Sequence, residues 1–372
     1  EDVVSVGREA GYPILLKASA GGGGKGMRVV AGEGEVASAF ERAASEAQAF
    51  FGDPAVYAEK LVDGARHVEV QIVFDGEGRG VAVGERECSI QRRHQKVVEE
   101  TPSPALDEER RQELLALAVK VAKAGHYWNA GTAEFLMDQQ GRFYFLEMNA
   151  RLQVEHPVTE MVLGMDLVRE QIRVARGEKL GLAQKDVRPE GASIEFRVYA
   201  EDPDQGFIPD AGTVRRLELP AGPGVRCDFG VRSGGVVPVY YDPMIGKIVV
   251  WARDRASAIE RARRALRETT LEGIKTTLPF HRWLLDQEPF AKGDFDTGFL
   301  SRHFKTADPA DQTQAEEDAA VIAAIFARTD AARPVLNAPS ADGDRRPMTA
   351  DATTTSRWRD ALQSHRAKGG GR

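Results

Sequence analysis

The sequence predicts an α+β protein of two or three domains, built from many short strands and a few amphipathic helices. The chain has 372 residues, of which 42% are hydrophobic, so it is long enough to bury a sizeable core. Short apolar or alternating runs bounded by Gly, Pro, Asn or Asp predict the strands. Longer segments with an apolar residue every three or four positions predict the helices.

The expected elements follow one another closely along the chain. Strands are expected at residues 12–17, 27–30, 56–60, 67–74, 80–85, 133–137, 142–149, 193–200, 212–219, 236–239 and 244–251. Helices are expected at residues 33–51, 108–124, 166–175 and 255–268. The helix at 108–124 has the clearest apolar face, which contains Leu114, Leu117, Ala118 and Val121, and Gly125 ends it.

Composition limits where the protein acts and what it binds. The net charge of −7 gives no reason to expect binding to nucleic acid or an anionic membrane, and no apolar run is long enough to cross a bilayer. Cys88 and Cys227 form no metal-binding spacing, and we recognise no secretory signal, so we expect a cytoplasmic protein. A disulfide between these two cysteines is the alternative.

The two ends of the sequence differ from its middle. It begins at Glu1 with no initiator Met, and a strand-like run follows almost at once, so we interpret it as a truncated chain. From about Lys305 the composition shifts to Ala, Asp, Thr and Pro, which predicts a flexible tail at 304–372. Transient helices are expected in that tail at Glu316–Ala327 and around Trp358.

A glycine-rich loop joins the first two expected strands. Its residues are Gly21, Gly22, Gly23, Gly24, Lys25 and Gly26. Glycines let backbone N–H groups approach a phosphate closely, and the lysine adds a positive charge. A strand instead of a helix follows the loop, and no Ser or Thr follows its lysine, so neither a dinucleotide fold nor a Walker-type loop is predicted. The loop suggests a mobile flap over a nucleotide; the alternative is a plain flexible turn.

Polar and apolar residues alternate strictly from position 147 to position 155. The polar set is Glu147, Asn149, Arg151, Gln153 and Glu155, which an extended segment would place on one face. An ordinary solvent-facing strand also alternates in this way. However, this polar set is chemically mixed, and the preceding run 143–146 is apolar at every position, as in a strand buried on both faces.

A second carboxylate on the neighbouring expected strand strengthens this hypothesis. A hairpin joining 133–137 to 142–149 would place Glu134 beside Glu147. Two carboxylates and an amide oxygen are ligands suited to Mg²⁺ that carries ATP phosphates. A third group, the basic and then acidic run at residues 91–100, would by itself be interpreted as a solvated loop.

Taken together, these residues resemble the biotin carboxylase family of ATP-grasp enzymes. The matching segments are Lys17 with Gly21–Met27, Gln91–Glu100, Glu147–Glu160 and Glu195–Pro203. The resemblance extends from Glu1 to about His303. It is strongest to the carboxylase subunits of acetyl-CoA and other acyl-CoA carboxylases, although pyruvate and urea carboxylases share the motifs.

The resemblance implies a particular domain order. An ATP-grasp lid would occupy residues 1–61, the ATP-grasp core with the metal and bicarbonate site 62–190, and a biotin carboxylase C-terminal domain 191–303, before the tail. The Rossmann-like N-terminal domain of the family would be absent, together with one ATP-contacting lysine and much of the dimer surface. We therefore expect this chain to be unstable or inactive by itself.

The resemblance also implies a role for each matching residue. The ATP site would contain Lys17, the flap Gly21–Gly26, Met27, Glu59, Val62, His67, Gln91 and His94. Mg²⁺, with Mn²⁺ as an alternative, would be held by Glu134, Glu147 and Asn149. Bicarbonate would be bound by Arg151, Gln153 and Val154. The catalytic residues would be Arg151, Lys96 beside the phosphate and bicarbonate, Glu155 as the base that deprotonates bicarbonate, and Arg197 opposite the biotin enolate.

The implied activity is ATP-dependent carboxylation of biotin through carboxyphosphate, the first half-reaction of an acyl-CoA carboxylase in fatty acid biosynthesis. No Met in the chain is followed by Lys, so biotin would arrive on a separate carrier protein or domain. A carboxyltransferase subunit and, for the full-length protein, a second copy are the other implied partners.

Two other hypotheses stay open. One is a different carboxyphosphate-forming ligase, such as a carbamoyl-phosphate synthetase; the runs Arg92–Lys96 and Glu195–Arg197 argue against it. The other is an inactive fragment that only binds partners, which the truncation suggests. Residues 127–130, Tyr-Trp-Asn-Ala, replace the smaller residues usual in the family before Gly131, and we have no functional account of them.

Overall fold

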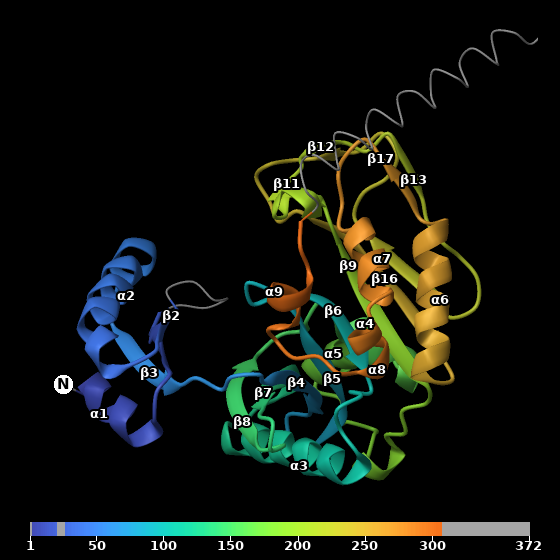
Figure 1. Cartoon of the computed structure of the whole chain (residues 1–372). Coiled ribbons are helices and arrows are strands. Elements are labelled where there is room, and N and C mark those ends of the chain that lie inside the picture. The colour runs from blue at the N-terminus through green and yellow to red at the C-terminus, as the bar shows by residue number, and fades with distance from the viewer. Residues whose placement is uncertain (1, 21–26, 307–372) are drawn as a thin grey trace, which may run out of the picture. The chain divides into compact units, whose positions relative to one another are not determined.

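The computed structural model describes residues 2–20 and 27–306 (Figure 1). The glycine flap expected at 21–26 and the transient helices expected beyond Ala307 lie outside these described residues.

A small antiparallel sheet forms the first part of the described chain. Its order is β2-β1-β3, with β1 at Ile14–Ala18, β2 at Arg28–Val30 and β3 at Val56–Lys60. Helices α1 (Asp2–Ala10) and α2 (Val36–Phe51) and the short turn η1 (Glu33–Glu35) accompany it. Because side chains alternate along a strand, Ile14 and Leu16 pack into the core while Lys17 faces the other way.

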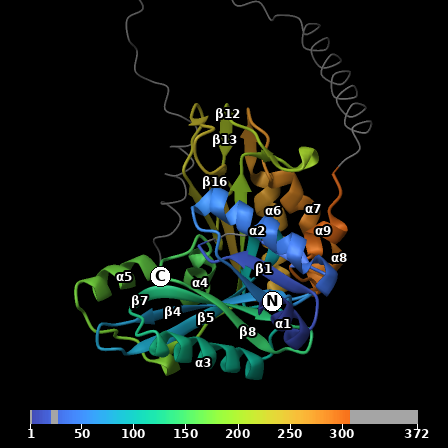
Figure 2. The same cartoon turned by 90° about the vertical axis from the view of Figure 1, so that its left-hand side faces the viewer.

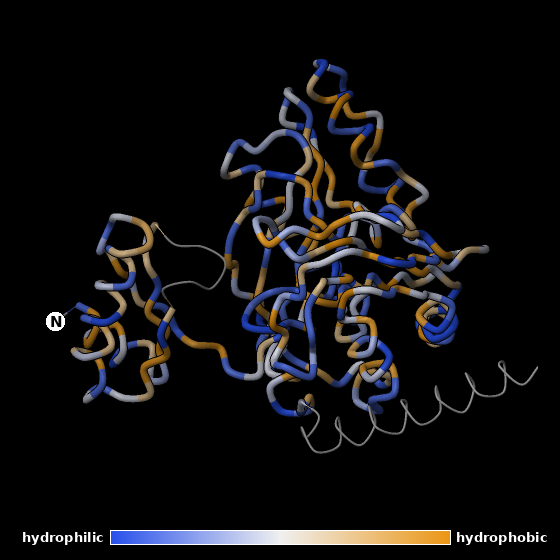
Figure 3. The backbone as a smooth tube through the Cα atoms, turned by 90° about the horizontal axis from the view of Figure 1, so that it is seen from above, coloured by the Kyte–Doolittle hydropathy of each residue, from blue (hydrophilic) through white to orange (hydrophobic). Residues whose placement is uncertain are grey.

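The larger sheet has eight antiparallel strands in the order β14-β16-β9-β6-β5-β4-β7-β8. Their bounds are Val225–Phe229 (β14), Met244–Ala252 (β16), Ala192–Tyr199 (β9), Gln95–Thr101 (β6), Gly80–Arg92 (β5), Arg66–Phe74 (β4), Asn129–Met137 (β7) and Phe143–Asn149 (β8). Hydrophobic and hydrophilic residues alternate along much of this sheet, as its tube shows in Figure 3. One face therefore joins the core, and the other is free to carry polar groups.

Helices cover both faces of the larger sheet. On the apolar face, α3 (Glu108–Ala124) packs over β4, β5 and β7, and α6 (Arg255–Glu268) packs over β9 and β16 beside α7 (Leu278–Leu285) (Figure 1). On the other face lie α4 (His156–Leu163) and α5 (Leu167–Ala175). In Figure 2, strands β4 and β7 run between α5 and α3.

Several short elements complete the described chain. They are η2 (Gln184–Asp186), β10 (Glu201–Asp202), η3 (Pro203–Gln205), β11 (Ile208–Pro209), β12 (Gly212–Thr213), β13 (Arg216–Glu218), β15 (Val236–Val237), β17 (Thr270–Glu272), α8 (Glu288–Lys292) and α9 (Phe299–His303). Within residues 2–20 and 27–306, no helix is long and apolar enough to cross a membrane. Both cysteines are free, with Cys88 buried and Cys227 half-buried.

The structure confirms most of the expected elements and corrects four. The strand expected at 212–219 is interrupted, because β12 ends at Thr213 and β13 begins at Arg216, and the two pair with different strands. The expected helices at 108–124 and 255–268 have the bounds of α3 and α6. The prediction that residues 143–146 form a strand buried on both faces is wrong, because β8 is the edge strand of the sheet and Phe145 is 48% exposed. The chain is not extended from 147 to 155, since β8 ends at Asn149 and α4 begins at His156. Residues 91–100 form the β5–β6 hairpin instead of a solvated loop.

Candidate active site

Charged side chains form a row across the face of the larger sheet that carries α4 and α5. Strand register places most of them directly opposite one another. The pairs are Glu147–Glu134, Glu134–Glu69, Glu69–Arg86, Glu99–Glu195, Arg197–Lys247 and Lys247–Asp228. The hairpin expected to place Glu134 beside Glu147 is therefore confirmed, and the row extends well beyond these two residues.

A bulge in β5 decides which charged residue of that strand enters the row. The register between β4 and β5 shifts at Gly84, whose φ of +133° is a conformation that side chains with a Cβ rarely adopt. Beyond the bulge, Arg86 faces the row, whereas Glu85 faces α3 and accepts a hydrogen bond from Arg111 (2.8 Å). Gly84 thus aims Arg86 at the site.

A pocket of about 260 Å³ lies between the small sheet and the β4–β8 end of the larger sheet. Nine of the residues expected to bind ATP or metal line it: Lys17, Met27, Glu59, Val62, His67, Gln91, His94, Glu134 and Glu147. Lys17 forms an ion pair with Glu59. Gln91 Nε2 lies 2.7 Å from His67 Nδ1, so the turn end of the β5–β6 hairpin is tied to β4. The pKa of His94 is lowered by burial and by the neighbouring charges of Lys17 and His67.

The carboxylates at the β7–β8 end form a set of oxygen donors. The side-chain nitrogen of Asn149 lies 3.0 Å from Oε1 of both Glu134 and Glu147, so the three residues converge on one point. His67 Nε2 lies 2.7 Å from Glu134 Oε2. Burial would raise the pKa of Glu134, but His67 and Lys96 hold it well below its ordinary value. An ionised buried carboxylate beside an exposed one and an amide is a donor set that suits Mg²⁺.

Lys96 connects this carboxylate set to the deeper part of the site. Its Nζ donates to Glu69 Oε2 (2.5 Å), to Glu155 Oε1 (2.7 Å) and to Glu134 Oε1 (3.0 Å). Burial alone would lower the pKa of Lys96, yet the surrounding carboxylates raise it well above its ordinary value. Lys96 therefore stays protonated, and it is a fixed positive charge between the carboxylates that flank it.

Glu155 lies between two cations at the start of α4. Lys96 Nζ donates to one of its oxygens (2.7 Å), and Arg197 Nη2 donates to the other (2.9 Å). The side chain is buried, which would raise its pKa, but Lys96, Arg197 and Arg86 hold the pKa well below the ordinary value. The carboxylate is therefore ionised, which is the form that a general base needs.

The expected bicarbonate residues are not equally close to this cluster. Gln153 is buried, donates to Glu134 Oε1 (2.6 Å) and accepts from Arg86 (3.1 Å). The Val154 carbonyl accepts a hydrogen bond from Lys247. Arg151 is exposed and donates to the Leu152 carbonyl (3.3 Å), at the edge of the cluster.

Arg86 and Glu69 are central to the site, and the sequence did not single them out. Both are completely buried. Besides Glu69, Arg86 donates to Gln71 (2.9 Å), Thr132, Gln153 and Thr159 (3.1 Å each), so it ties β4 and β7 to the α4 segment. The available signal was a charged residue inside an otherwise apolar strand run, as in Val68-Glu69-Val70.

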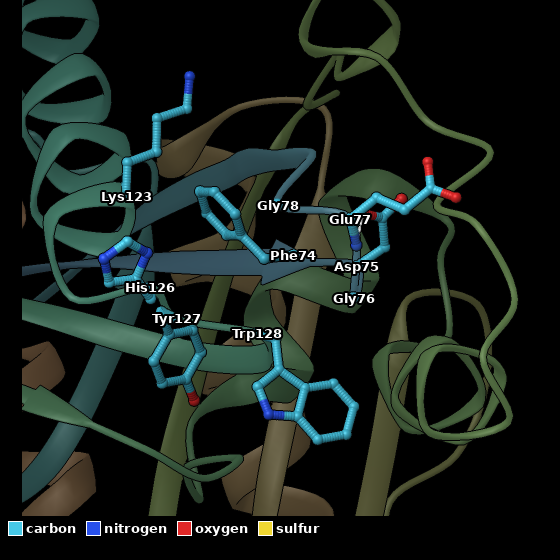
Figure 4. A pocket seen from close by; sticks show the side chains of 9 residues that line it. All are labelled: Phe74, Asp75, Gly76, Glu77, Gly78, Lys123, His126, Tyr127 and Trp128. Carbon is cyan, nitrogen blue, oxygen red and sulfur yellow. Dashed lines mark hydrogen bonds between the residues drawn. The ribbon is translucent and has the colours of Figure 1, made fainter.

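A larger depression, of about 680 Å³, lies elsewhere on the surface (Figure 4). The loop 75–78, the end of α3, Tyr127 and Trp128 line it, and none of the expected site residues does. Tyr127 donates to the Ala130 carbonyl (3.0 Å), and its ring fills the space that a side chain at Gly131 would need. The unexplained Tyr-Trp-Asn-Ala segment thus has a packing role at Tyr127.

Comparison with known proteins agrees with this geometry. Residues 1–183 match the family model described as the ATP-binding domain of the carbamoyl-phosphate synthase L chain, and residues 195–302 match the biotin carboxylase C-terminal domain. Biotin carboxylase 1 of Bacillus subtilis is 50% identical over 304 residues, which is 82% of this chain and 68% of that protein.

Two solved structures are also similar to this chain. The biotin carboxylase domain of Hydrogenobacter thermophilus 2-oxoglutarate carboxylase, in complex with MgADP, ADP and bicarbonate, has a TM-score of 0.79 at 44% identity, over 82% of this chain and 68% of that one. The biotin carboxylase of Campylobacter jejuni has a TM-score of 0.78 at 47% identity, over 81% and 67%.

Proposed function

Because this chain belongs to the biotin carboxylase family, we propose that it uses ATP and bicarbonate to carboxylate biotin through carboxyphosphate. The observation that carries the proposal is the position of Glu155. It lies between Lys96 and Arg197, and Lys96 also contacts the Glu134 carboxylate of the expected metal site. Direct hydrogen bonds thus join the proposed base Glu155 to the proposed oxyanion-binding cation Arg197 and, through Lys96, to the proposed metal site.

The nucleotide is proposed to occupy the pocket between the small sheet and the larger one. We propose residues 1–61 as the ATP-grasp lid, 62–190 as the core and 191–303 as the C-terminal domain. Lys17 would contact the phosphates, and Met27, Glu59 and Val62 would line the base, with Gly21–Gly26 as the flap. The other contacts with the nucleotide would come from His67, Gln91 and His94. The presence of these seven residues, the flap aside, on one pocket surface supports this arrangement.

Glu134, Glu147 and Asn149 are the proposed ligands of Mg²⁺ or Mn²⁺. A bound ion there would offset the negative charge of the transferring phosphate. The chain contributes the rest of the electrostatics: Lys96 is held protonated beside the site, and Gln153 holds Glu134 in place from the side of Arg86.

Bicarbonate needs to lose its proton to become a good nucleophile. Glu155 is the proposed base, because it is ionised, buried and oriented from both sides. Arg151, Gln153 and the Val154 backbone are proposed to bind the anion, and Gln153 has the best support because it is already fixed next to Arg86 and Glu134. Carboxyphosphate would release CO₂ and phosphate, and the phosphate would take the ureido proton of biotin.

Arg197 is proposed to stabilise the biotin enolate. A positioned cation that meets a developing oxyanion in a buried site is an oxyanion-hole device, and loss of one such donor typically costs about 10²–10³ in kcat. Arg197 is buried, its Nη2 is held by Glu155, and its Nε has no hydrogen-bond partner among the described residues.

The proposed partners are a biotin carrier protein or domain, a carboxyltransferase and a second copy of the full-length chain. We propose an acyl-CoA carboxylase as the setting. This chain is also similar to the biotin carboxylase domain of a 2-oxoglutarate carboxylase, so 2-oxoglutarate is tested as an acceptor beside acyl-CoA.

The test is ADP release from MgATP, measured with this chain and with the longest natural chain that contains it. We expect release to require both bicarbonate and free biotin. Release that needs ammonia instead would favour a carbamoyl-phosphate synthetase, the activity that the family model for residues 1–183 is named after. MgATP binding by calorimetry without any turnover would favour a fragment that only binds.

A further inference from the structure

Two acidic residues lie behind Arg197 and have no role in the chemistry described so far. Glu99 of β6 and Glu195 of β9 are directly opposite one another in the sheet, and both are completely buried. Neither side chain has a hydrogen-bond partner of good geometry among the described residues, although Arg197 Nη2 lies 2.5 Å from Glu99 Oε1. Two buried carboxylates in this state destabilise the fold unless something neutralises one of them.

The charges around the pair indicate what neutralises it. Arg197 is the cation in contact with Glu99, but Arg197 also donates to Glu155 (2.9 Å), and the nearest cation to Glu195 is Lys247 at 3.9 Å. The pair therefore has too little positive charge beside it for both carboxyl groups to ionise. A single proton held by the pair removes this imbalance.

We propose that Glu99 and Glu195 share one proton, with the charge on Glu99 and the proton on Glu195, and that this pair positions Arg197. The proton belongs on Glu195 because Glu99 contacts Arg197 at 2.5 Å, whereas the nearest cation to Glu195 is Lys247 at 3.9 Å. The inference rests on the proposed function, in which Arg197 faces the biotin enolate.

The pKa values agree with this assignment. Burial and the charge of Glu99 raise the pKa of Glu195 well above its ordinary value. Burial raises the pKa of Glu99 to about 7, against the opposing effect of Arg197. The titratable and charged groups that act on the pair are Arg197, Tyr199, Lys247, Lys96, Cys88 and Glu155, and Asp228 and His156 lie near Lys247.

The pair acts on two catalytic groups at once. Glu99 contacts Arg197, and Arg197 in turn donates to Glu155. Lys247, which lies 3.9 Å from Glu195, donates to the carbonyl of Val154, the residue before Glu155. When the shared proton is lost at alkaline pH, a second negative charge appears behind Arg197 and competes with the biotin oxyanion for its guanidinium.

The first test is the pH profile of biotin-dependent turnover in Glu195→Gln and Glu99→Gln. A glutamine at 195 imitates the protonated acid, so the alkaline limb should move upward by about one pH unit or more, the size expected for a strongly coupled pair. Glu99→Gln removes the charge that holds Arg197, and kcat should fall about 10²-fold with little change in KM for ATP. Glu100→Gln is the matched control, because Glu100 is buried on the opposite face of the sheet and paired with Arg255. The alkaline limb of the pH profile of this variant should be the same as in wild type.

The second test needs no turnover. Infrared spectra of the chain should contain the band of a protonated carboxyl at neutral pH, and Glu195→Gln should remove it while Glu100→Gln does not. A wild-type chain without this band, or an alkaline limb that is the same in Glu195→Gln and wild type, would overturn the proposal. If wild type shows the band but never uses biotin, the proposed function fails while the proton-sharing pair stands.

Discussion

Replacement of Glu155 by glutamine is the most informative single substitution in this site. Glutamine keeps the size and one acceptor oxygen of the side chain, but it cannot take a proton from bicarbonate. A positioned general base contributes about 10²–10⁴ in rate, which corresponds to about 3–5 kcal/mol on the barrier. We therefore expect bicarbonate-dependent ADP release in Glu155→Gln to fall at least 100-fold, about the lower limit of that range.

The structure also predicts that this variant folds. Removal of one partner of a buried ion pair costs about 3–5 kcal/mol when it leaves a charge unpaired. Here Lys96 keeps Glu69 (2.5 Å) and Glu134 (3.0 Å), and Arg197 keeps Glu99 (2.5 Å). The expected loss is therefore only that of a charge-assisted hydrogen bond, about 1.5–3 kcal/mol in the free energy of unfolding.

The assay measures ADP release with bicarbonate and biotin, MgATP affinity by calorimetry, and the free energy of unfolding in urea. Glu85→Gln is the control, because Glu85 is a buried, ion-paired acid on the opposite face, where it contacts Arg111. We expect nucleotide affinity to survive in both variants and turnover to be lost in Glu155→Gln alone. Equal loss of nucleotide binding and turnover in Glu155→Gln would refute its role as the base.

Three further predictions follow from the same geometry. Arg86→Met leaves Glu69 with Lys96 alone and removes the donor of four other buried side chains, so it should reduce the free energy of unfolding by about 3–5 kcal/mol in urea. The loss for Arg79→Met, whose side chain is 52% exposed, should be at most about 1 kcal/mol, and similar losses in the two variants would contradict the buried network. Glu147→Gln should raise the Mg²⁺ concentration needed for half-maximal ADP release by at least about tenfold, a typical cost for a weakened metal site. The control Glu77→Gln should leave this concentration unchanged. If the Mg²⁺ titrations of Glu147→Gln and wild type are identical, Glu147 is not a metal ligand. The free energy of unfolding should be greatest at mildly acidic pH. The low pKa of Glu134 stabilises the folded state, and this stabilisation is lost as pH falls below the ordinary glutamate value. The raised pKa of Glu99 also stabilises the folded state at low pH, and this stabilisation is lost as pH rises through about 7. Melting temperatures across pH should show both declines in wild type, and in Glu99→Gln a weaker decline between the ordinary glutamate value and about pH 7.

Local patterns were enough to predict many elements of the fold. The apolar periodicity of α3 and α6 and the glycine and proline boundaries around β3 gave correct bounds. The short Gln139-Gln140-Gly141 turn predicted that Glu134 and Glu147 lie on neighbouring strands, but their direct pairing also depends on a register shift between Glu134 and Phe135 that the sequence did not show.

Features that depend on distant strands could not be predicted in this way. Phe145 looked buried because its run is apolar, but only its place at the sheet edge decides its exposure. Arg86 enters the site because of the Gly84 bulge, and the pairing of Glu99 with Glu195 joins segments almost a hundred positions apart. The family resemblance, in contrast, marked half of the pocket residues without any knowledge of these pairings.

The central claim is that bicarbonate attacks the terminal phosphate of ATP at Glu155. Turnover with oxygen-labelled bicarbonate tests it most directly, because such an attack transfers one bicarbonate oxygen to the phosphate that is released. We predict labelled inorganic phosphate in a biotin-dependent reaction, and none from Glu155→Gln. Unlabelled phosphate released at the full rate of biotin-dependent turnover would contradict the account.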